Sequence, residues 1–250
     1  MRRAERATIG IVMSAVLVLS SGVGCGGSSP GDVTVFAASS LTEGFEQISR
    51  VYDRSNDADV ALDFDGSARL ATQIAQGAPA DVFASADRRT MDDVVESVGA
   101  RRGPEVFALN ELTIVVERGN PTGITGLADL ARGDLRVALA DPAVPAGAYA
   151  ADVLDRAGVV VDPATLEGNV RGVVTKVSLG EADAGIVYVT DVAATDDALE
   201  TVAIPRADNV TAEYLIAVLE DAPDGADEFA DLVLGPEGRA ILRAQGFGLP

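Results

Sequence analysis

The stretch VTVFAASSLTEGFEQISRVY, residues 33–52, sets the pattern of the fold. Its opening residues, Val33 to Phe36, are rich in β-branched and aromatic side chains and predict a strand. From Leu41 to Tyr52 the apolar residues recur at helical spacing and predict an amphipathic helix. The buried face of that helix would carry Leu41, Phe45, Ile48 and Tyr52.

The same alternation of strand and helix continues along the chain, as expected of βα units around a mostly parallel sheet. Further strands are predicted at Val60 to Phe64, Asp81 to Ser85, Leu135 to Ala140 and Ala184 to Val189. Helices are predicted at Ser67 to Gln76 (closed by Gly77), Asp87 to Val98, Ala146 to Ala157 and Arg171 to Leu179. The fold class is therefore α/β.

Two long apolar stretches, Val106 to Val116 and Thr211 to Leu219, could cross between two lobes. If they do, the first lobe is discontinuous, with residues 32–110 and 211–250, and the second lobe holds residues 111–210. We expect two Rossmann-like lobes with a ligand cleft between them.

The N-terminus has the layout of a secretory signal. Arginines 2, 3 and 6 precede an apolar run at about residues 9–19, followed by small residues. We predict a signal peptide at residues 1–24 and a flexible tether at residues 25–31. Cys25 is the only cysteine, and Gly22-Val23-Gly24-Cys25 resembles a bacterial lipobox, with Gly22 where leucine is usual. Lipid attached to Cys25 would anchor the chain to a membrane.

The chain is strongly acidic. Its formal charge is −20, and removal of residues 1–24 changes it to −22, because three arginines and one glutamate are lost. No basic run reverses this field locally, so nucleic acid is not expected as a partner.

Most catalytic chemistry is excluded by composition. The chain has no histidine, and its one cysteine lies at the predicted processing site. Pairs of carboxylates among 39 acidic residues still leave a secreted hydrolase open.

Small polar segments open four of the predicted helices. They are Ala38-Ser39-Ser40-Leu41-Thr42, Asp65-Gly66-Ser67-Ala68, Val144-Pro145-Ala146-Gly147 and Asn169-Val170-Arg171-Gly172. Helix N-termini present free N–H groups and the positive end of the helix dipole, which makes them sites for anions. The sequence thus suggests an oxyanion held by neutral dipoles.

Structural roles for the same residues are equally open. Ser40 with Glu43 fits a capping box, and Ser67 is an N-cap candidate. Ala146 and Val170 could act only through backbone N–H groups and otherwise read as packing residues. Tyr188 could be a core tyrosine, and Arg171 could neutralise an anion or form an ion pair.

Several segments, in one order, are familiar. They are VTVFAASSLTEGF (33–45), SARLATQIAQGAPADVFASAD (67–87), DPAVPAGAYA (141–150), NVRGVV (169–174), ADAGIVYVTD (182–191) and GPEGRAILRAQGFG (235–248). With these segments the chain resembles the periplasmic molybdate-binding proteins of ABC transporters over residues 33–247, which implies a type 2 periplasmic-binding fold.

The resemblance implies an oxyanion site made by Ser40, Ser67, Ala146, Val170 and Tyr188, with Ala146 and Val170 acting through backbone N–H groups. Ser39 stands where the family often has alanine and could add or compete for a contact. Asp65 brings a carboxylate close to this anion site, which is a departure from many relatives.

The implied function is capture of molybdate, and tungstate as a near isostere, outside the cytoplasm and its delivery to a permease with a cytoplasmic ATPase. The chain would be a monomer anchored to the outer face of the cell membrane or periplasmic. It would have no enzymatic activity and no cofactor, and molybdenum would enter only as the bound oxyanion. Three alternatives stay open: binding of sulfate or another tetrahedral oxyanion, a carboxylate hydrolase, and a structural surface lipoprotein.

Overall fold

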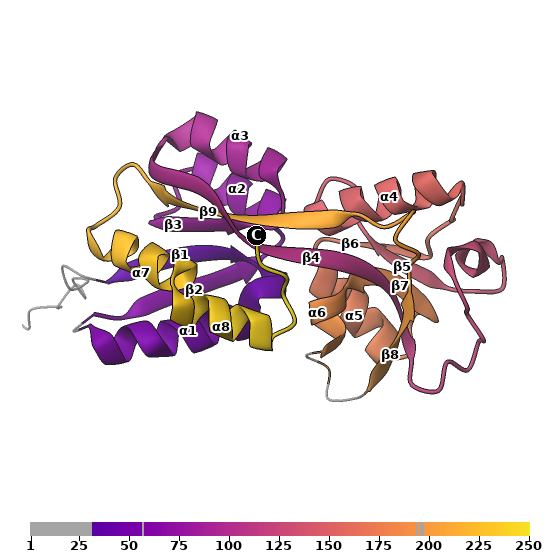
Figure 1. The fold of residues 1–250 in the computed structure, drawn as a ribbon. Coiled ribbons are helices and arrows are strands. Elements are labelled where there is room, and N and C mark those ends of the chain that lie inside the picture. Colours follow the sequence, from indigo (N-terminus) through magenta and orange to yellow (C-terminus); the bar gives the residue numbers. More distant parts are fainter. Residues whose placement is uncertain (1–31, 57, 194, 196–197) are drawn as a thin grey trace, which may run out of the picture.

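The computed structural model describes residues 32–56, 58–193, 195 and 198–250. The predicted signal peptide, Cys25 and the tether lie outside this part of the chain. Helices pack on a mixed sheet that extends through two lobes (Figure 1). Among the described residues, no helix is long and apolar enough to cross a membrane.

The sheet of the first lobe has the order β2-β1-β3-β9-β4. Its parallel strands are β1 (Val33–Ala38), β2 (Val60–Asp65) and β3 (Val82–Ser85). Two long strands, β4 (Ala100–Glu117) and β9 (Thr211–Leu219), run antiparallel to each other and complete it. All six residues of β1 except Thr34 are buried, as the central strand of a covered sheet requires.

Helices cover both faces of this sheet (Figure 1). One face carries α2 (Ser67–Ala75) and α3 (Arg88–Val98). The other carries α1 (Thr42–Ser55), α7 (Gly225–Leu234) and α8 (Pro236–Ala244). Phe45 of α1 packs edge-on against Phe229 of α7 with ring centroids 5.9 Å apart, so these helices share one core.

The second lobe continues the sheet in the order β4-β7-β5-β6, with β8 also paired to β4. Its own strands are β5 (Val137–Ala140), β6 (Thr165–Glu167), β7 (Ala184–Tyr188) and β8 (Leu199–Ala203). Its helices are a 3₁₀ segment at Leu127–Ala131, α4 (Pro145–Ala157), α5 (Val170–Ser178) and α6 (Val189–Ala193). Helices α4 and α5 lie on opposite faces of β5 and β7 (Figure 1).

Strands β4 and β9 connect the lobes. Residues of β4 up to Glu111 pair with β9, whereas residues from Leu112 onward pair with β7. The strand therefore changes partners at one point of its length. The division into a first lobe of residues 32–110 and 211–250 and a second lobe of residues 111–210 stays a prediction.

Several predicted boundaries need correction. The first helix begins at Thr42, after a 3₁₀ turn at Ser39–Leu41, and not at Leu41. The apolar stretch from Val106 to Val116 is part of a longer strand that begins at Ala100, because Gly103 and Pro104 interrupt the apolar pattern at a point where the register with β9 also shifts. The strand predicted to end at Val189 ends at Tyr188, since Val189 opens α6.

Candidate functional site

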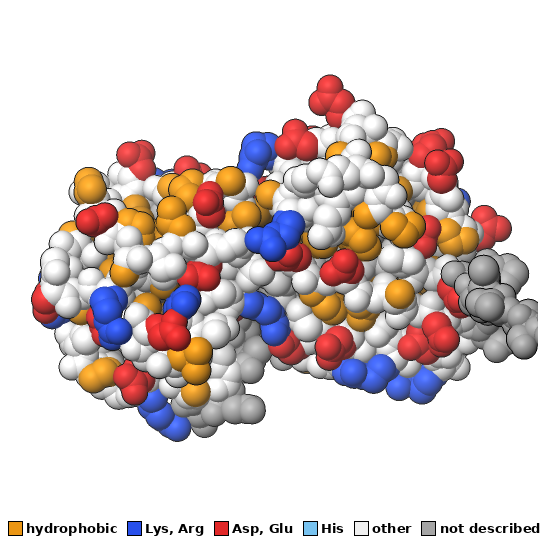
Figure 2. Space-filling model, turned by 180° about the vertical axis from the view of Figure 1, so that it is seen from behind, with side chains coloured by type: hydrophobic (Ala, Val, Ile, Leu, Met, Phe, Trp, Pro, Cys, Tyr) orange, Lys and Arg blue, Asp and Glu red, His pale blue; other side chains and the backbone are white. Residues whose placement is uncertain are grey.

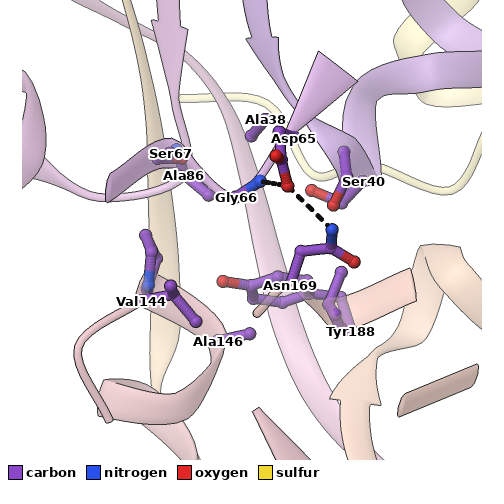
Figure 3. A pocket seen from close by; sticks show the side chains of 13 residues that line it. Ala38, Ser40, Asp65, Gly66, Ser67, Ala86, Val144, Ala146, Asn169 and Tyr188 are labelled. Atoms are coloured by element: carbon purple, nitrogen blue, oxygen red, sulfur yellow. Dashed lines mark hydrogen bonds between the residues drawn. The ribbon is translucent and has the colours of Figure 1, made fainter. Parts of the chain in front are cut away.

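The carboxyl ends of six strands converge on one small cavity between the lobes (Figure 3). The first lobe contributes the turns after β1, β2 and β3, and the second contributes those after β5 and β6 together with the end of β7. The cavity is lined by Ala38, Ser39, Ser40, Asp65, Gly66, Ser67, Ala86, Val144, Pro145, Ala146, Asn169, Val170 and Tyr188. All six residues predicted to touch an oxyanion, Ser39 included, are thereby brought together.

The cavity is small. The space open to the centre of a water-sized sphere is about 20 Å³. About 10–15 Å³ on this scale holds one water molecule. A cavity of this volume suits a compact inorganic ion and not a sugar or a peptide.

Ser40 and Ser67 are held by their surroundings and not by helix capping. The Ser40 hydroxyl shares a hydrogen bond of 2.8 Å with the Tyr214 hydroxyl, and Glu43 pairs with Arg171, so the predicted capping box is wrong. The Ser67 hydroxyl accepts from the Ala86 N–H at 3.1 Å, and Gly66, not Ser67, is the N-cap of α2. Both serines are almost fully buried and line the cavity.

Backbone groups at helix starts supply the remaining donors. Ser67 and Val170 are the first residues of α2 and α5, and Ala146 is the second residue of α4. The first N–H groups of a helix have no partner within it and lie at the positive end of the dipole. Pro145 fits the first position of α4 because a proline there loses no hydrogen bond.

Tyr188 ends β7 with its side chain in the cavity wall. Its ring packs edge-on against Tyr214 with centroids 5.7 Å apart. Its hydroxyl is buried without a hydrogen-bond partner, as are those of Thr90 and Thr122 among the described residues, and of the three only Tyr188 lines the cavity. Burial, followed by the nearby Tyr214, raises the pKa of the Tyr188 phenol well above its usual range. The hydroxyl therefore keeps its proton and is a neutral donor awaiting an acceptor.

The one carboxylate among the lining residues is already occupied. Asp65 Oδ1 accepts from the Gly66 N–H at 2.7 Å and from the Asn169 side-chain amide at 2.9 Å, and Oδ2 lies 3.3 Å from Arg69 Nε. Figure 3 shows the first two contacts. The carboxylate of Asp65, which departs from the pattern of many relatives, is thus already paired with hydrogen-bond donors of the protein. The cavity therefore offers an anion mainly neutral hydrogen-bond donors.

Arg171 forms an ion pair, which is one of the two roles that the sequence left open for it. Its guanidinium pairs with Glu43 and donates from Nε to the Ser39 carbonyl oxygen at 2.8 Å. It is absent from the cavity lining. The positive charge is therefore balanced beside the site.

Sequence reasoning missed two residues that shape this site. Asn169 was read only as part of a helix-opening segment, yet it caps α5 through Oδ1, which accepts from the Gly172 N–H at 3.0 Å, and also lines the cavity. Tyr214 lies behind Ser40 within an apolar stretch that gave no sign of a polar role. The described residues contain no group of three His, Cys, Asp or Glu side chains that could hold a metal ion.

Comparison with known proteins shows the family of this chain. Residues 33–248 match the model of the family described as bacterial extracellular solute-binding protein. The Molybdate-binding protein ModA of Mycobacterium tuberculosis is 39% identical over 96% of this chain and 97% of its own length. The protein of the same name from Escherichia coli is 33% identical over 87% of this chain and 89% of its own length.

Solved structures show the same fold. The periplasmic molybdate-binding protein of Azotobacter vinelandii matches with a TM-score of 0.74 at 21% identity, covering 87% of this chain and 99% of that chain. The sulfate-binding protein SubI of Mycobacterium tuberculosis matches with a TM-score of 0.78 at 18% identity, covering 87% of this chain and 86% of that chain. A molybdate-binding protein and a sulfate-binding protein thus both match this fold, so the fold alone does not identify the ligand. The chain belongs to the bacterial extracellular solute-binding protein family.

Proposed function

We propose that this chain is the substrate-capturing component of an ABC transporter and that its ligand is molybdate, with tungstate as a near isostere. The observation that carries the proposal is the small cavity between the lobes, where the buried Tyr188 hydroxyl has no partner and which three helix N-termini and two serines line. A tetrahedral dianion supplies the acceptors that this set of donors needs.

The proposed contacts come from both lobes. Ser40 and Ser67 belong to the first lobe, and Ala146, Val170 and Tyr188 belong to the second. Ser39 is a proposed additional contact because it also lines the cavity. Hydrogen bonds to a charged group contribute about 1.5–3 kcal/mol each, so five of them sum to about 8–15 kcal/mol, which is enough for a binding free energy of about −8 to −12 kcal/mol. Because the ligand bridges the lobes, binding favours their closure.

The donor set argues against phosphate. Near neutral pH phosphate is partly monoprotonated and needs an acceptor in its site. The only lining carboxylate, Asp65, is already occupied by Gly66, Asn169 and Arg69. Sulfate is fully deprotonated and smaller than molybdate, so sulfate is the second candidate and cavity size must reject it. The names of the relatives from Mycobacterium tuberculosis and Escherichia coli favour molybdate over sulfate.

An extracytoplasmic location follows from membership of an extracellular solute-binding family. We further propose that Cys25 carries a lipid that anchors the protein to the outer face of the cell membrane. A relative from Bacillus subtilis, 29% identical over 86% of this chain, is provisionally named an ABC transporter substrate-binding lipoprotein. The partners would be a membrane permease and its cytoplasmic ATPase, the protein itself acting as a monomer.

Binding without turnover is the proposed activity. The site holds neutral donors and one carboxylate that is already paired, which leaves no general base beside the ligand position. A hydrolase would instead need a pair of free carboxylates facing a substrate.

Isothermal titration of residues 25–250 carrying Cys25→Ser, with molybdate, tungstate, sulfate and phosphate, tests the proposal. We expect tight one-to-one binding of molybdate and tungstate, weaker sulfate binding and no phosphate binding. Equal affinity for sulfate would make the chain a general oxyanion carrier. Heat from none of the four anions would overturn the ligand assignment.

A further inference from the structure

Besides a hydrogen bond of 3.5 Å from Arg89 Nη2 to the Ala143 carbonyl oxygen, two sets of contacts join the lobes beside the cavity. In the first, the Asn169 side-chain amide of the second lobe donates to Asp65 Oδ1 of the first lobe at 2.9 Å. In the second, Arg171 of α5 donates to the Ser39 carbonyl oxygen at 2.8 Å and pairs with Glu43 of α1. The positions that meet are 104 and 128–132 residues apart in sequence.

These contacts belong to a closed arrangement of the lobes. At the same place, a Cβ atom added to Gly66 would lie 2.6 Å from the Gly168 carbonyl oxygen. The turn after β2 and the turn after β6 are therefore in backbone contact. Separation of the lobes would break both side-chain contacts and this backbone approach together.

The residues of each contact lie next to proposed ligand-binding residues in the sequence. Asn169 and Arg171 flank Val170 on the second lobe. On the first lobe, Ser39 precedes Ser40, and Asp65 lies two residues before Ser67. Formation of the contacts therefore fixes the separation of the donor groups that an oxyanion must bridge.

The side chains that form these contacts are oriented by neighbours on their own lobes. Asn169 uses Oδ1 to cap α5, which leaves its amide nitrogen free to reach Asp65. Asp65 is oriented by the Gly66 N–H and by Arg69. The side chains of Arg171 and Glu43 are 40% and 37% exposed, so water can solvate both charges when the lobes part. Opening thus leaves no buried charge unpaired, and the contacts can break and reform.

We propose that Asn169–Asp65 and Arg171–Ser39/Glu43 form an interlobe clasp that sets the closed fraction of the protein, and thereby the affinity and release rate of its oxyanion. Apparent affinity scales with the fraction of molecules in the binding-competent state. Asn169 and Arg171 are positioning residues in this role. The effect on the oxyanion rests on the proposed function, whereas the effect on closure does not.

The test uses residues 25–250 with Cys25→Ser and spin labels at Glu96→Cys on α3 and Asp155→Cys on α4, one on each lobe. Both positions are exposed. Electron–electron double resonance gives the interlobe distance distribution without and with molybdate, and titration with stopped flow gives Kd and the release rate.

Asn169→Asp is the sharpest variant, because aspartate also caps helices but places a carboxylate against Asp65. We expect the unliganded lobes to shift to larger separations and Kd for molybdate to rise about 10- to 100-fold. Asn169→Ser keeps a hydroxyl that can cap α5 and removes only the hydrogen bond to Asp65. It should shift the interlobe distance and Kd in the same direction by a smaller amount. If the melting temperature of Asn169→Ser is near that of the parent, the effect does not come from unfolding.

Glu43→Gln and Arg171→Gln should each raise Kd about 3- to 10-fold, and the double variant should do no more than the larger single change. Glu46→Gln and Arg50→Gln are the matched controls. They make the same charge changes in an exposed pair that lies within α1, 3.9 Å apart, and does not cross the cleft. They should leave the interlobe distances and Kd unchanged.

Unchanged distance distributions and unchanged Kd in all clasp variants would overturn the clasp while leaving the proposed function intact. If the parent protein binds no oxyanion, the proposed function fails. The clasp is then still judged by whether Asn169→Asp opens the unliganded lobes relative to the parent.

Discussion

At the scale of single residues, Tyr188 is the best supported of the proposed ligand donors. Its hydroxyl is buried in the cavity wall with no partner, which costs free energy unless a ligand supplies an acceptor. Sequence could not show this, because a tyrosine at the end of an apolar strand is more often a core residue. The missing partner is visible only when all neighbours are in place.

Tyr188→Phe should weaken molybdate binding about 10- to 150-fold, because one hydrogen bond of about 1.5–3 kcal/mol to the charged ligand is lost. The melting temperature of the unliganded protein should stay the same or rise, since no internal bond is broken. Titration and thermal unfolding measure the two effects.

Tyr52→Phe is the matched control. The Tyr52 hydroxyl donates to the Gly225 carbonyl oxygen at 3.1 Å within the first lobe. Its loss should lower the melting temperature and leave Kd unchanged. A drop in melting temperature without a change in Kd for Tyr188→Phe would assign Tyr188 to the core.

The buried carboxyl group of Asp191 leads us to expect that stability depends on pH. Burial, opposed by the Tyr188 N–H, raises the pKa of this carboxyl from 3.8 to about 7. Between those values the folded protein keeps a proton that the unfolded chain releases, so the free energy of unfolding falls as pH rises from about 4 to 7 and then levels off.

Asp191→Asn should remove most of this slope and make the variant more stable than the parent at pH 8, by a few kcal/mol at about 1.4 kcal/mol per pKa unit. Urea unfolding at pH 5 and pH 8 measures it. Equal slopes in variant and parent would mean that Asp191 titrates in its ordinary range.

At the scale of elements, the sequence predicted strands and helices well where the pattern is local. The strand at Thr211–Leu219 has the bounds expected from its apolar run, and Ser67 opens α2 as predicted. Strands β6 and β8 were not predicted, because three and five residues with exposed positions carry too little apolar pattern.

The junctions themselves were found from sequence, but their partners across the cleft were not. The contact of Asn169 with Asp65 depends on two turns that are 104 residues apart. No local pattern encodes which turns meet. The family resemblance supplied the proposed ligand-binding positions, whereas the contacts between the lobes came from the structure.

The close approach of these turns leads to a prediction for Gly66→Ala. A Cβ atom there would lie 2.6 Å from the Gly168 carbonyl oxygen, so the methyl group should wedge the lobes apart. We expect weaker molybdate binding, a larger interlobe distance with ligand bound, and little change in the melting temperature of the unliganded protein.

Gly126→Ala is the control, because a Cβ atom at that position meets nothing within 4 Å and the backbone there is extended. It should change neither Kd nor the interlobe distance. Wild-type affinity in Gly66→Ala would show that the turns can separate without loss of the bound state.

At the scale of the whole molecule, a dianion must approach a protein of the same sign. The full sequence carries a formal charge of −20. Acidic side chains are spread over both lobes on the face seen in Figure 2 and do not gather in one patch. Both arginines beside the cavity are paired with carboxylates, Arg69 with Asp65 and Arg171 with Glu43. Affinity must therefore come from short-range hydrogen bonds, while the long-range field opposes association.

Salt should consequently speed binding. The screening length falls from about 30 Å at 0.01 M to about 8 Å at 0.15 M ionic strength, which weakens the repulsion between protein and dianion. In stopped flow, the association rate constant for molybdate should rise between 0.01 and 0.15 M sodium chloride, while the release rate from the closed cavity changes little. A falling association rate would instead require a positive field at the mouth of the cleft. In that case Arg69→Gln should abolish the salt dependence, since Arg69, whose side chain is 60% exposed, would then be acting as a free cation.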